Sequence, residues 1–235
     1  YIDNNNIRRA LSGNEDELWH QQRLRILFLT KELNAGPDRT DTYDLRQDSF
    51  RVIRNINGNH RQSNLINDKG LNKMIAYTFH GMIHSMEYSN EPFLEYTKIS
   101  AHEVETTIDK YVFARINVKP TGGTNNSNDN EVLCEALKYG KYTFRRIKNL
   151  CPKVIVCCGN KNNRNIIIED FLNKIGFHFD WTDVQGIWTD KQLNIVAIDT
   201  YHPSYTKYGY EESQLYNDIV KALYNYIQKN PNFLK

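Results

Sequence analysis

The chain has 235 residues, of which 40% are hydrophobic and 25% charged, and its formal net charge at pH 7 is +2. This length suits one sizeable α/β domain and leaves little room for two. The weak positive charge permits a polyanionic partner without requiring one, and no apolar run approaches the roughly 18 residues of a membrane span. The composition therefore argues against a membrane-spanning protein and indicates a globular one.

Four short apolar runs predict the strands of a sheet. The first, RILFLT, is nearly continuous, which is typical of a strand covered on both faces. The four runs are RILFLT at 25–30, YVFARINV at 111–118, KVIVCC at 153–158 and LNIVAID at 193–199. A short hairpin is expected around Trp181 to Trp188, just before the last of these strands.

Helical periods separate the predicted strands. They lie at 43–57, at 71–86, from the expected N-cap Asp129 through Ile147, at 167–175 before Gly176, and from Glu211 to about Lys229. The second of these helices carries all three methionines, which we expect to fill the core. Because strands alternate with helices, we predict one α/β domain over 1–235, with its core at about 24–228. The expected architecture is a central, mostly parallel, four-stranded sheet with helices on both faces.

The chain contains four cysteines, Cys134, Cys151, Cys157 and Cys158. None forms a C-x-x-C motif, and the adjacent pair Cys157 and Cys158 should point to opposite faces of a strand. This spacing argues against a shared metal site and against a disulfide framework. We therefore expect buried free thiols in a reducing compartment.

The loops that follow the predicted strands should carry the chemistry, because ligands of such sheets bind outside the carboxyl ends of the strands. In chain order these loops offer Glu32, Asn117, the turn Gly159-Asn160-Lys161, and His202. A carboxylate can orient water or stabilise a cation, and an imidazole can stabilise departing negative charge. The set suits hydrolysis of a bond whose leaving group becomes an anion.

The order of these motifs resembles the uracil-DNA glycosylase superfamily, over about Leu24 to Tyr226. In that family an apolar strand leads into G-Q-D-P-Y or G-I-N-P-G, and T-K-E-L-N at 30–34 aligns with this motif. The family's second strand ends on an Asn, as RINVKP does at Asn117. Its last motif, H-P-S, stands unaltered at 202–204. The resemblance implies a uracil-DNA glycosylase-like fold.

The first motif departs from the family pattern at three positions. Thr30 replaces the opening Gly, Leu33 replaces the Pro, and Glu32 stands where Asp or Asn is usual. The iron–sulfur branches of the family carry four spaced cysteines, whereas the cysteines here fall in predicted helices and a strand. The chain thus resembles a divergent member without an iron–sulfur cluster, and we expect no cofactor and no metal.

The resemblance implies a monofunctional DNA glycosylase, which hydrolyses the N-glycosidic bond of a flipped pyrimidine and leaves an abasic site. Glu32 would hold the attacking water and stabilise an oxocarbenium-like sugar. His202 would donate a hydrogen bond to O2 of the base, with its imidazole charged or neutral. Asn117 would read the base, because its amide can match uracil or, when flipped, cytosine.

Base flipping also requires a wedge, a stacking partner and contacts to the DNA backbone. Tyr205, directly after H-P-S, is the expected wedge, and Tyr43 is the expected stacking partner, with Phe50 as the alternative. Contacts to DNA phosphates are expected from Ser204, Gly159, Asn160, Lys161 and Lys207.

Asn34 bears on the choice of base. Strict uracil enzymes of the family have a Tyr at this position, which blocks a substituent on carbon 5 of the pyrimidine. Because Asn34 is smaller and polar, we expect the site to accept uracil or a 5-substituted pyrimidine, such as a phage modified cytosine. The expected roles are therefore DNA repair or phage defence.

Two other functions stay open from the sequence: a nucleoside or nucleotide hydrolase, and a protein on the same fold that binds DNA without cutting it. For the leading function we expect a monomer with DNA as its partner and no membrane association. Its expected location is cytoplasmic in a bacterial or phage-associated setting, or nuclear in a eukaryote.

Overall fold

The computed structural model describes residues 15–31, 33–34, 71–120, 122–123, 128–161, 164–203 and 211–234. Its chain divides into two compact units. The first comprises residues 25–44 and 114–202 together with residues 1–2, and the second comprises 3–24, 45–113 and 203–235. The single domain expected over 1–235 stays a prediction.

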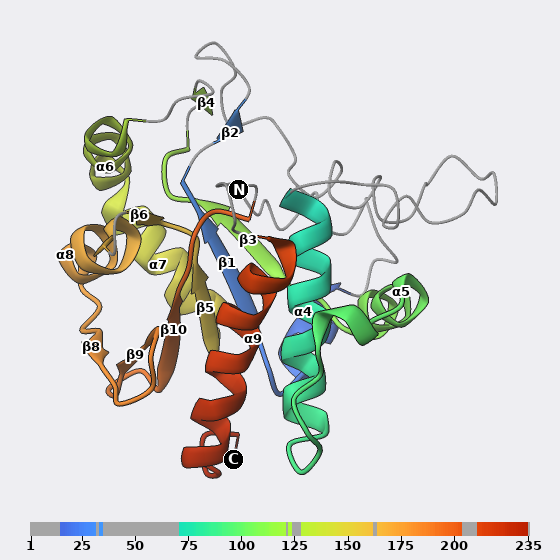
Figure 1. The fold of residues 1–235 in the computed structure, drawn as a ribbon. Coiled ribbons are helices and arrows are strands. Elements are labelled where there is room, and N and C mark those ends of the chain that lie inside the picture. Colours follow the sequence, from blue (N-terminus) through green and yellow to red (C-terminus); the bar gives the residue numbers. More distant parts are fainter. Residues whose placement is uncertain are drawn as a thin grey trace. The chain divides into compact units, whose positions relative to one another are not determined.

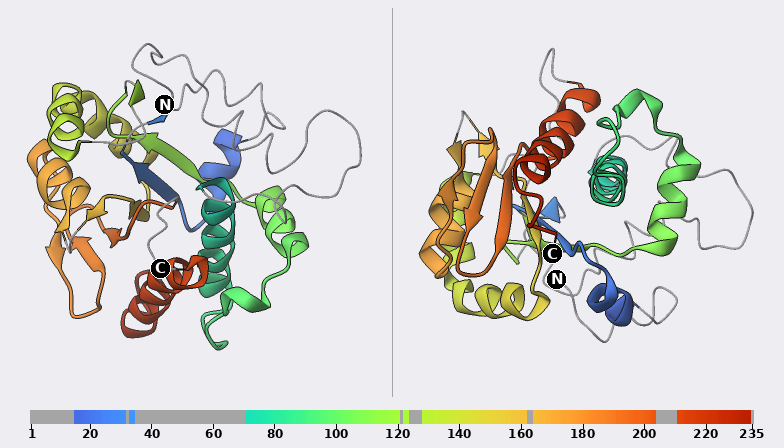
Figure 2. Two further views of the ribbon diagram at one scale, coloured as in Figure 1. Left: turned by 45° about the horizontal axis from the view of Figure 1, so that its top comes forward. Right: turned by 90° about the horizontal axis from the view of Figure 1, so that it is seen from below.

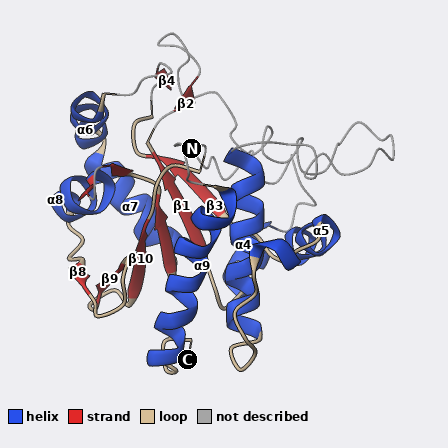
Figure 3. Cartoon of the chain, in the orientation of Figure 1, coloured by secondary structure: helices blue, strands red, loops and turns tan. Residues whose placement is uncertain are grey.

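One mixed sheet of six strands organises the first unit, which is an α/β structure (Figures 1 and 3). Its strands, in the order in which they lie side by side, are β3 (Ala114–Asn117), β1 (Ile26–Thr30), β5 (Val154–Cys157), β10 (Ile195–Asp199), β9 (Ile187–Asp190) and β8 (Asp180–Trp181). The first four run parallel to one another, whereas β9 is antiparallel to both β10 and β8. The sheet is therefore mostly parallel, as predicted.

The predicted number of strands was wrong, because the hairpin near the tryptophans joins the same sheet. Trp181 and Trp188 are register partners in β8 and β9, and their ring centroids lie 4.2 Å apart. Ile187 of β9 in turn pairs with Ile198 of β10. The hairpin thus extends the four predicted strands by two.

The sheet reverses its winding next to β1. From β1 the chain goes to β3 on one side and later to β5 on the other side. In open α/β sheets the crevice beside such a reversal, outside the carboxyl ends of the strands, is the usual place for a ligand. The residues that follow β1 and β5 are therefore the first to consider for a site.

The loops that leave β1 and β3 continue side by side. The N–H groups of Val118 and Lys119 donate to the carbonyls of Thr30 and Lys31, each at 2.9 Å. Beyond them β2 (Leu33–Asn34) pairs in parallel with β4 (Gly122–Gly123). The loop after β5 closes a second small ladder, in which β6 (Asn160–Lys161) pairs with the antiparallel β7 (Arg164–Asn165).

The helices of the first unit are α6 (Asp129–Lys138), α7 (Gly140–Leu150), the π-helix η2 (Ile166–Leu172) and α8 (Asn173–Ile175). The sequence predicts α6 and α7 as one helix, but the structure divides it into two helices at Tyr139. A Cβ on Gly140 would lie only 2.7 Å from Ile175, so a glycine permits this close approach. The N-cap of α6 is Asn128 rather than Asp129. Gly176, with φ of 115°, ends α8 as predicted.

The second unit is helical in the part that the structure describes. Its elements are α2 (Glu15–Gln21), α4 (Leu71–Glu87), the 3₁₀ turn η1 (Tyr96–Lys98), α5 (Ala101–Lys110) and α9 (Glu212–Lys229). Helices α4 and α9 run side by side in both views of Figure 2. At Gly81 of α4 an added Cβ would meet the ring of Tyr216 of α9, so a glycine permits the contact there. The three methionines of α4 are buried, as predicted.

The sequence analysis does not predict two helices of the second unit, and one helix that it does predict lies outside the described residues. The unpredicted helices are α2 and α5; the latter begins with a capping box between Ser100 and Glu103. Tyr111 ends α5, since its N–H donates to the carbonyl of Thr107, so β3 is shorter than the predicted run 111–118. The helix expected at 43–57 is the one that lies outside.

The four cysteines are free thiols, but only two of them are buried. Cys157 and Cys158, at the end of β5, are fully buried, which confirms the prediction for this pair. The prediction was wrong for the other two. Cys134 lies on an exposed position of α6, and Cys151 caps the exposed end of α7 in a left-handed conformation with φ of 46°.

Candidate functional site

Polar side chains form a row across one face of the parallel sheet, at the carboxyl ends of its strands. The register pairs Thr30 with Asn117, and it pairs Phe28 with both Arg115 and Val156. Because side chains alternate between faces, two residues beyond Val156 the face continues at Cys158, and two residues beyond Ile198 it continues at Thr200. We call Arg115, Asn117, Thr30, Cys158, Thr200 and His202 the polar row.

Thr30 fixes the amide of Asn117. The Thr30 side chain is fully buried, and its hydroxyl donates a short hydrogen bond to Asn117 Oδ1. Asn117 itself is 9% exposed. Among the residues that the structure describes, none accepts a hydrogen bond from its Nδ2. The amide is thus held in one orientation, with a donor left for a ligand.

Arg115 lies in the same strand, two residues before Asn117. Its Nε is 3.4 Å from Thr30 Oγ1, and no carboxylate within the described ranges forms an ion pair with its guanidinium. Burial lowers the pKa of Arg115 to about 10, and the nearby Cys158 raises it only partly back. A cation that is withdrawn from water without a carboxylate partner is costly in a folded protein.

Cys158 occupies the middle of the polar row. Burial raises the pKa of its thiol to about 12, although the nearby Arg115 acts in the opposite direction. The thiol therefore stays neutral at pH 7, and a neutral thiol is a poor nucleophile. Its position next to Arg115 makes it part of the floor of the site rather than a reacting group.

His202 follows the end of β10 by three residues, and two cations, Arg115 and Lys31, lie near enough to shift its pKa. Burial is the largest cause that lowers the pKa of His202, and Arg115 and Lys31 lower it further, to about 4. The imidazole is consequently neutral at pH 7 and can donate one hydrogen bond from one nitrogen. The positive charge of the site resides on Arg115 and Lys31 instead.

Two lysines of the exit loops are tied to the first turn of α6. Lys31 Nζ lies 2.7 Å from Asp129 Oδ1, and Lys119 Nζ lies 3.1 Å from Glu131 Oε1. Both acidic residues stand at the amino end of the helix, where the helix dipole also favours negative charge. These contacts hold Lys31 in place beside the polar row.

Thr200 is a second polar group of the row without a partner. It is 3% exposed, and its Oγ1 makes no hydrogen bond with any residue that the structure describes. Its backbone is bonded on both sides, because its N–H donates to Cys157 O and its carbonyl accepts from Asn160 N–H. The hydroxyl is therefore fixed in position and unsatisfied, a condition that is rare for buried polar groups.

The opposite face of the same strand ends carries a dense hydrogen-bond network around Asn165, which is fully buried. Its Nδ2 donates to Cys157 O and to Asp199 Oδ1, and its Oδ1 accepts from the N–H groups of Ile167 and Ile168. Asn160 Nδ2 donates to the same oxygen of Asp199, at 2.8 Å. Burial raises the pKa of Asp199, and the two amide donors counteract this shift.

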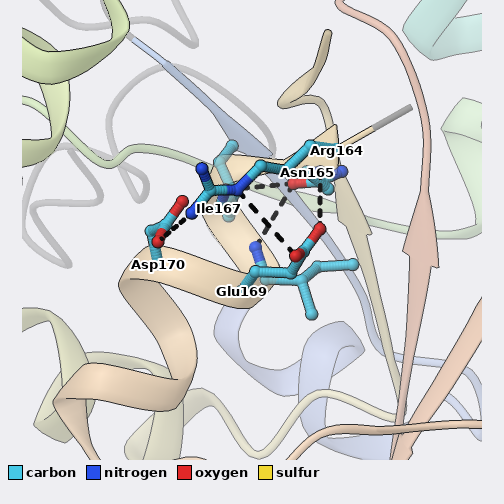
Figure 4. Close-up of polar contacts among 6 residues, drawn as sticks. Arg164, Asn165, Ile167, Glu169 and Asp170 are labelled. Atoms are coloured by element: carbon cyan, nitrogen blue, oxygen red, sulfur yellow. Dashed lines mark hydrogen bonds and ion pairs between the residues drawn. The ribbon is translucent and has the colours of Figure 1, made fainter. Parts of the chain in front are cut away.

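Figure 4 shows how this network starts η2. The N–H of Asn165 donates to Glu169 Oε1 at 3.0 Å, and Arg164 reaches Asp170 at 2.6 Å and Glu169 at 3.9 Å. Asn165 thus caps the helix and joins it to the end of the sheet. We call the group Asn160, Asn165, Asp199, Glu169 and Arg164 the amide network.

The structure places some of the predicted site residues and leaves others undescribed. Asn117 and His202 both lie at the carboxyl edge of the sheet. Asn34 lies in β2 beside Gly123. Glu32, Tyr43, Ser204, Tyr205 and Lys207, and the alternative Phe50, lie outside the described residues, so their expected roles stay predictions.

The predicted phosphate-binding turn belongs to the ladder of β6 and β7. Gly159 is buried, and an added Cβ would lie 2.7 Å from Ile167 and 2.8 Å from Asn165 Oδ1. Asn160 uses its Nδ2 for Asp199, while its Oδ1 has no hydrogen-bond partner within the described ranges. Lys161 lies in β6.

Sequence reasoning missed Arg115, Cys158, Thr200 and Lys31 as members of this site. One signal was present: Arg115 is a charged residue inside an otherwise apolar run, YVFARINV. Thr30 and Thr200 also stand at or directly after the ends of their apolar strands. Only the register between strands shows that these residues lie in one row.

Comparison of the chain with family models, with curated proteins and with solved structures found no match. In the described ranges no three His, Cys, Asp or Glu side chains gather as metal ligands would. Nor does any helix described there have the length and apolar character needed to span a bilayer.

Proposed function

We propose that the protein is a monofunctional DNA glycosylase that hydrolyses the N-glycosidic bond of a flipped pyrimidine. The observation that carries this proposal is a neutral His202 beside two cations, at the sheet edge that also holds Asn117. A departing base develops negative charge on its ring. A neutral imidazole donor with fixed positive charges nearby is suited to stabilise that charge.

In the proposed reaction a water molecule attacks the anomeric carbon of the sugar and the carbon–nitrogen bond breaks. The bonding electrons leave with the base, whose O2 accepts a hydrogen bond from His202. Glu32 would receive the proton of the attacking water and stabilise the cationic sugar. Asn117 Nδ2, which the Thr30 hydroxyl orients through the other amide atom, would donate to a carbonyl of the base.

The two cations contribute without transferring a proton. Arg115 and Lys31 both disfavour protonation of His202. The neutral imidazole therefore donates a hydrogen bond from its N–H and does not transfer a proton. The same charges attract the anionic base as it leaves and the phosphates of DNA as it arrives. The departing base takes up a proton from water and Glu32 releases its proton to water, so the products are the neutral free base and an abasic site.

A panel of oligonucleotides tests this proposal. Each duplex or single strand carries uracil, a thymine mismatch or a modified cytosine at one position, and alkali cleaves the strand wherever a base has been released. We expect strand cleavage with at least one of these bases and release of the intact base, measured by mass spectrometry. A plain-uracil preference within the panel would overturn the expectation that the site accepts 5-substituted bases.

Two outcomes would favour the other functions. Hydrolysis of free nucleosides or nucleotides, with weak binding of longer DNA, would indicate a nucleoside or nucleotide hydrolase. Tight binding of DNA without release of any base would indicate a binding protein. Glu32→Gln is the matched variant, because it keeps the side-chain volume and should abolish base release by a true glycosylase.

A further inference from the structure

Two polar groups of the row lie near the proposed base reader: Arg115 stands two residues before Asn117 on β3, and Thr200 stands level with Asn117 at the end of β10. Arg115 precedes Asn117 by two residues on the same face of β3, which is about 7 Å along the strand. Among the described residues no carboxylate pairs with its guanidinium, and none forms a hydrogen bond with the Thr200 hydroxyl. The Arg115 guanidinium contacts Thr30 and lies near Cys158, which is beside Thr200 in the row, so a ligand held by Asn117 at the strand ends would lie next to both groups.

The chemistry of the two groups indicates what they can bind. A guanidinium offers several N–H donors in a plane and pairs best with a carboxylate or phosphate, which accept two parallel hydrogen bonds. A threonine hydroxyl can donate one more. The neighbouring groups Cys158 and His202 are both neutral at pH 7, so neither cancels the charge of Arg115.

We propose that Arg115 and Thr200 bind an anionic oxygen group, a carboxylate or a phosphate, on the ligand that Asn117 and His202 contact. That the ligand is a pyrimidine rests on the proposed function. The anionic group has two possible sources, which are a carboxylate on carbon 5 of the base and the phosphate of a nucleotide. Plain uracil or thymine leaves Arg115 without an ion-pair partner and binds less well.

Binding of small ligands to the intact chain tests this proposal without any need for catalysis. Isothermal titration calorimetry compares 2′-deoxycytidine, 5-carboxy-2′-deoxycytidine, 2′-deoxycytidine 5′-monophosphate and inorganic phosphate. We expect 5-carboxy-2′-deoxycytidine, 2′-deoxycytidine 5′-monophosphate or both to bind at least about 10-fold more tightly than deoxycytidine, because hydrogen bonds to charged groups contribute at this level. The stronger of the two identifies the source of the anionic group.

Variants assign the preference to the two residues. In Arg115→Met the anionic nucleosides and deoxycytidine should bind alike, within about 2-fold, and in Thr200→Val the preference should shrink. Arg145→Met is the matched control, since Arg145 is exposed on α7, and it should keep the full preference. If Arg115→Met does not fold, Arg115→Lys keeps the charge without the planar donors and should retain only part of the preference.

Two results would overturn the proposal. One is equal affinity of the wild-type protein for 2′-deoxycytidine, 5-carboxy-2′-deoxycytidine and 2′-deoxycytidine 5′-monophosphate. The other is an undiminished preference for the two anionic compounds in Arg115→Met. Failure of the proposed function has a separate signature. In that case no base is released from any oligonucleotide, while the anion preference and its dependence on Arg115 are still measured in the calorimeter.

Discussion

At the ends of β5 and β10 the two faces of the sheet differ in how well their polar groups are hydrogen-bonded. On one face the amide network satisfies Asp199 with two amide donors, and Asn165 makes hydrogen bonds through both atoms of its amide. On the other face, one residue further along β10, the Thr200 hydroxyl has no partner and Arg115 has no carboxylate among the described residues. Adjacent residues of one strand therefore belong to two different kinds of site.

This difference separates groups that hold the fold from groups that await a ligand. The amide network, although Asn160 Oδ1 has no partner among the described residues, bonds its other buried groups, and such a network stabilises the native state and fixes the chain around it. A half-buried cation without a described carboxylate partner and a buried hydroxyl without a described hydrogen-bond partner both lower stability, so we attribute them to an interaction made only when a ligand is bound. The following changes separate these two roles.

The largest effect on stability is expected from Asn165→Ala in the amide network. The substitution removes hydrogen bonds to Cys157 O, Asp199, Ile167 N and Ile168 N, and leaves these buried groups unsatisfied. We expect the free energy of unfolding, measured by urea denaturation, to fall by about 3 kcal/mol or more. Asn149→Ala, at an exposed position of α7, should change it by less than about 0.5 kcal/mol. Similar small changes in both variants would contradict a structural role for the amide network.

The pH dependence of stability should report on His202. Its pKa is about 4 in the folded protein and about 6.5 in the unfolded chain, so the unfolded chain takes up the proton first as the pH falls. The contribution of His202 is therefore complete above pH 6.5 and is lost between pH 6.5 and 4, by at most about 1.4 kcal/mol per pH unit. His202→Gln should remove this part of the slope when unfolding is measured at pH 7, 6 and 5. Parallel curves for the wild type and His202→Gln would mean that the imidazole titrates normally.

The smallest effect is expected from a matched pair of Thr to Val substitutions. Thr182 Oγ1 accepts from Val184 N–H and donates to Ile187 O at 2.9 Å, whereas Thr200 Oγ1 has no hydrogen-bond partner in the described part of the chain. Thr182→Val should lower the free energy of unfolding by about 1 kcal/mol, while Thr200→Val should leave it unchanged or raise it by up to about 1 kcal/mol. A clear loss of stability in Thr200→Val would show that its hydroxyl serves the fold.

The sequence predicts the four parallel strands of the sheet well, because each strand lies within its own apolar run. The same local signals locate the ends of α9 and the stop at Gly176, which depend on neighbouring residues only. The split between α6 and α7 could not be predicted in this way. It depends on the approach of Ile175 to Gly140, two residues that are far apart in sequence.

The candidate site is predictable only in part for a similar reason. Asn117 and His202 were found because they directly follow strands, and the resemblance gave each of them a role. Arg115 and Thr200 were missed because a strand's alternation tells which of its own residues share a face, but not which residues of other strands lie beside them. Register is a property of the folded sheet, and it alone assembles the polar row.

The most direct test of the account measures base release by His202→Ala on whichever base the wild-type protein excises from the oligonucleotide panel. Single-turnover rates should be determined at pH 7.5, with Asn149→Ala as the control. We expect a rate at least about 100-fold below that of the wild type for His202→Ala, since one donor to a developing negative charge contributes at that level. The control should keep the wild-type rate. Base release by His202→Ala at the wild-type rate would contradict the assignment of the polar row as the active site.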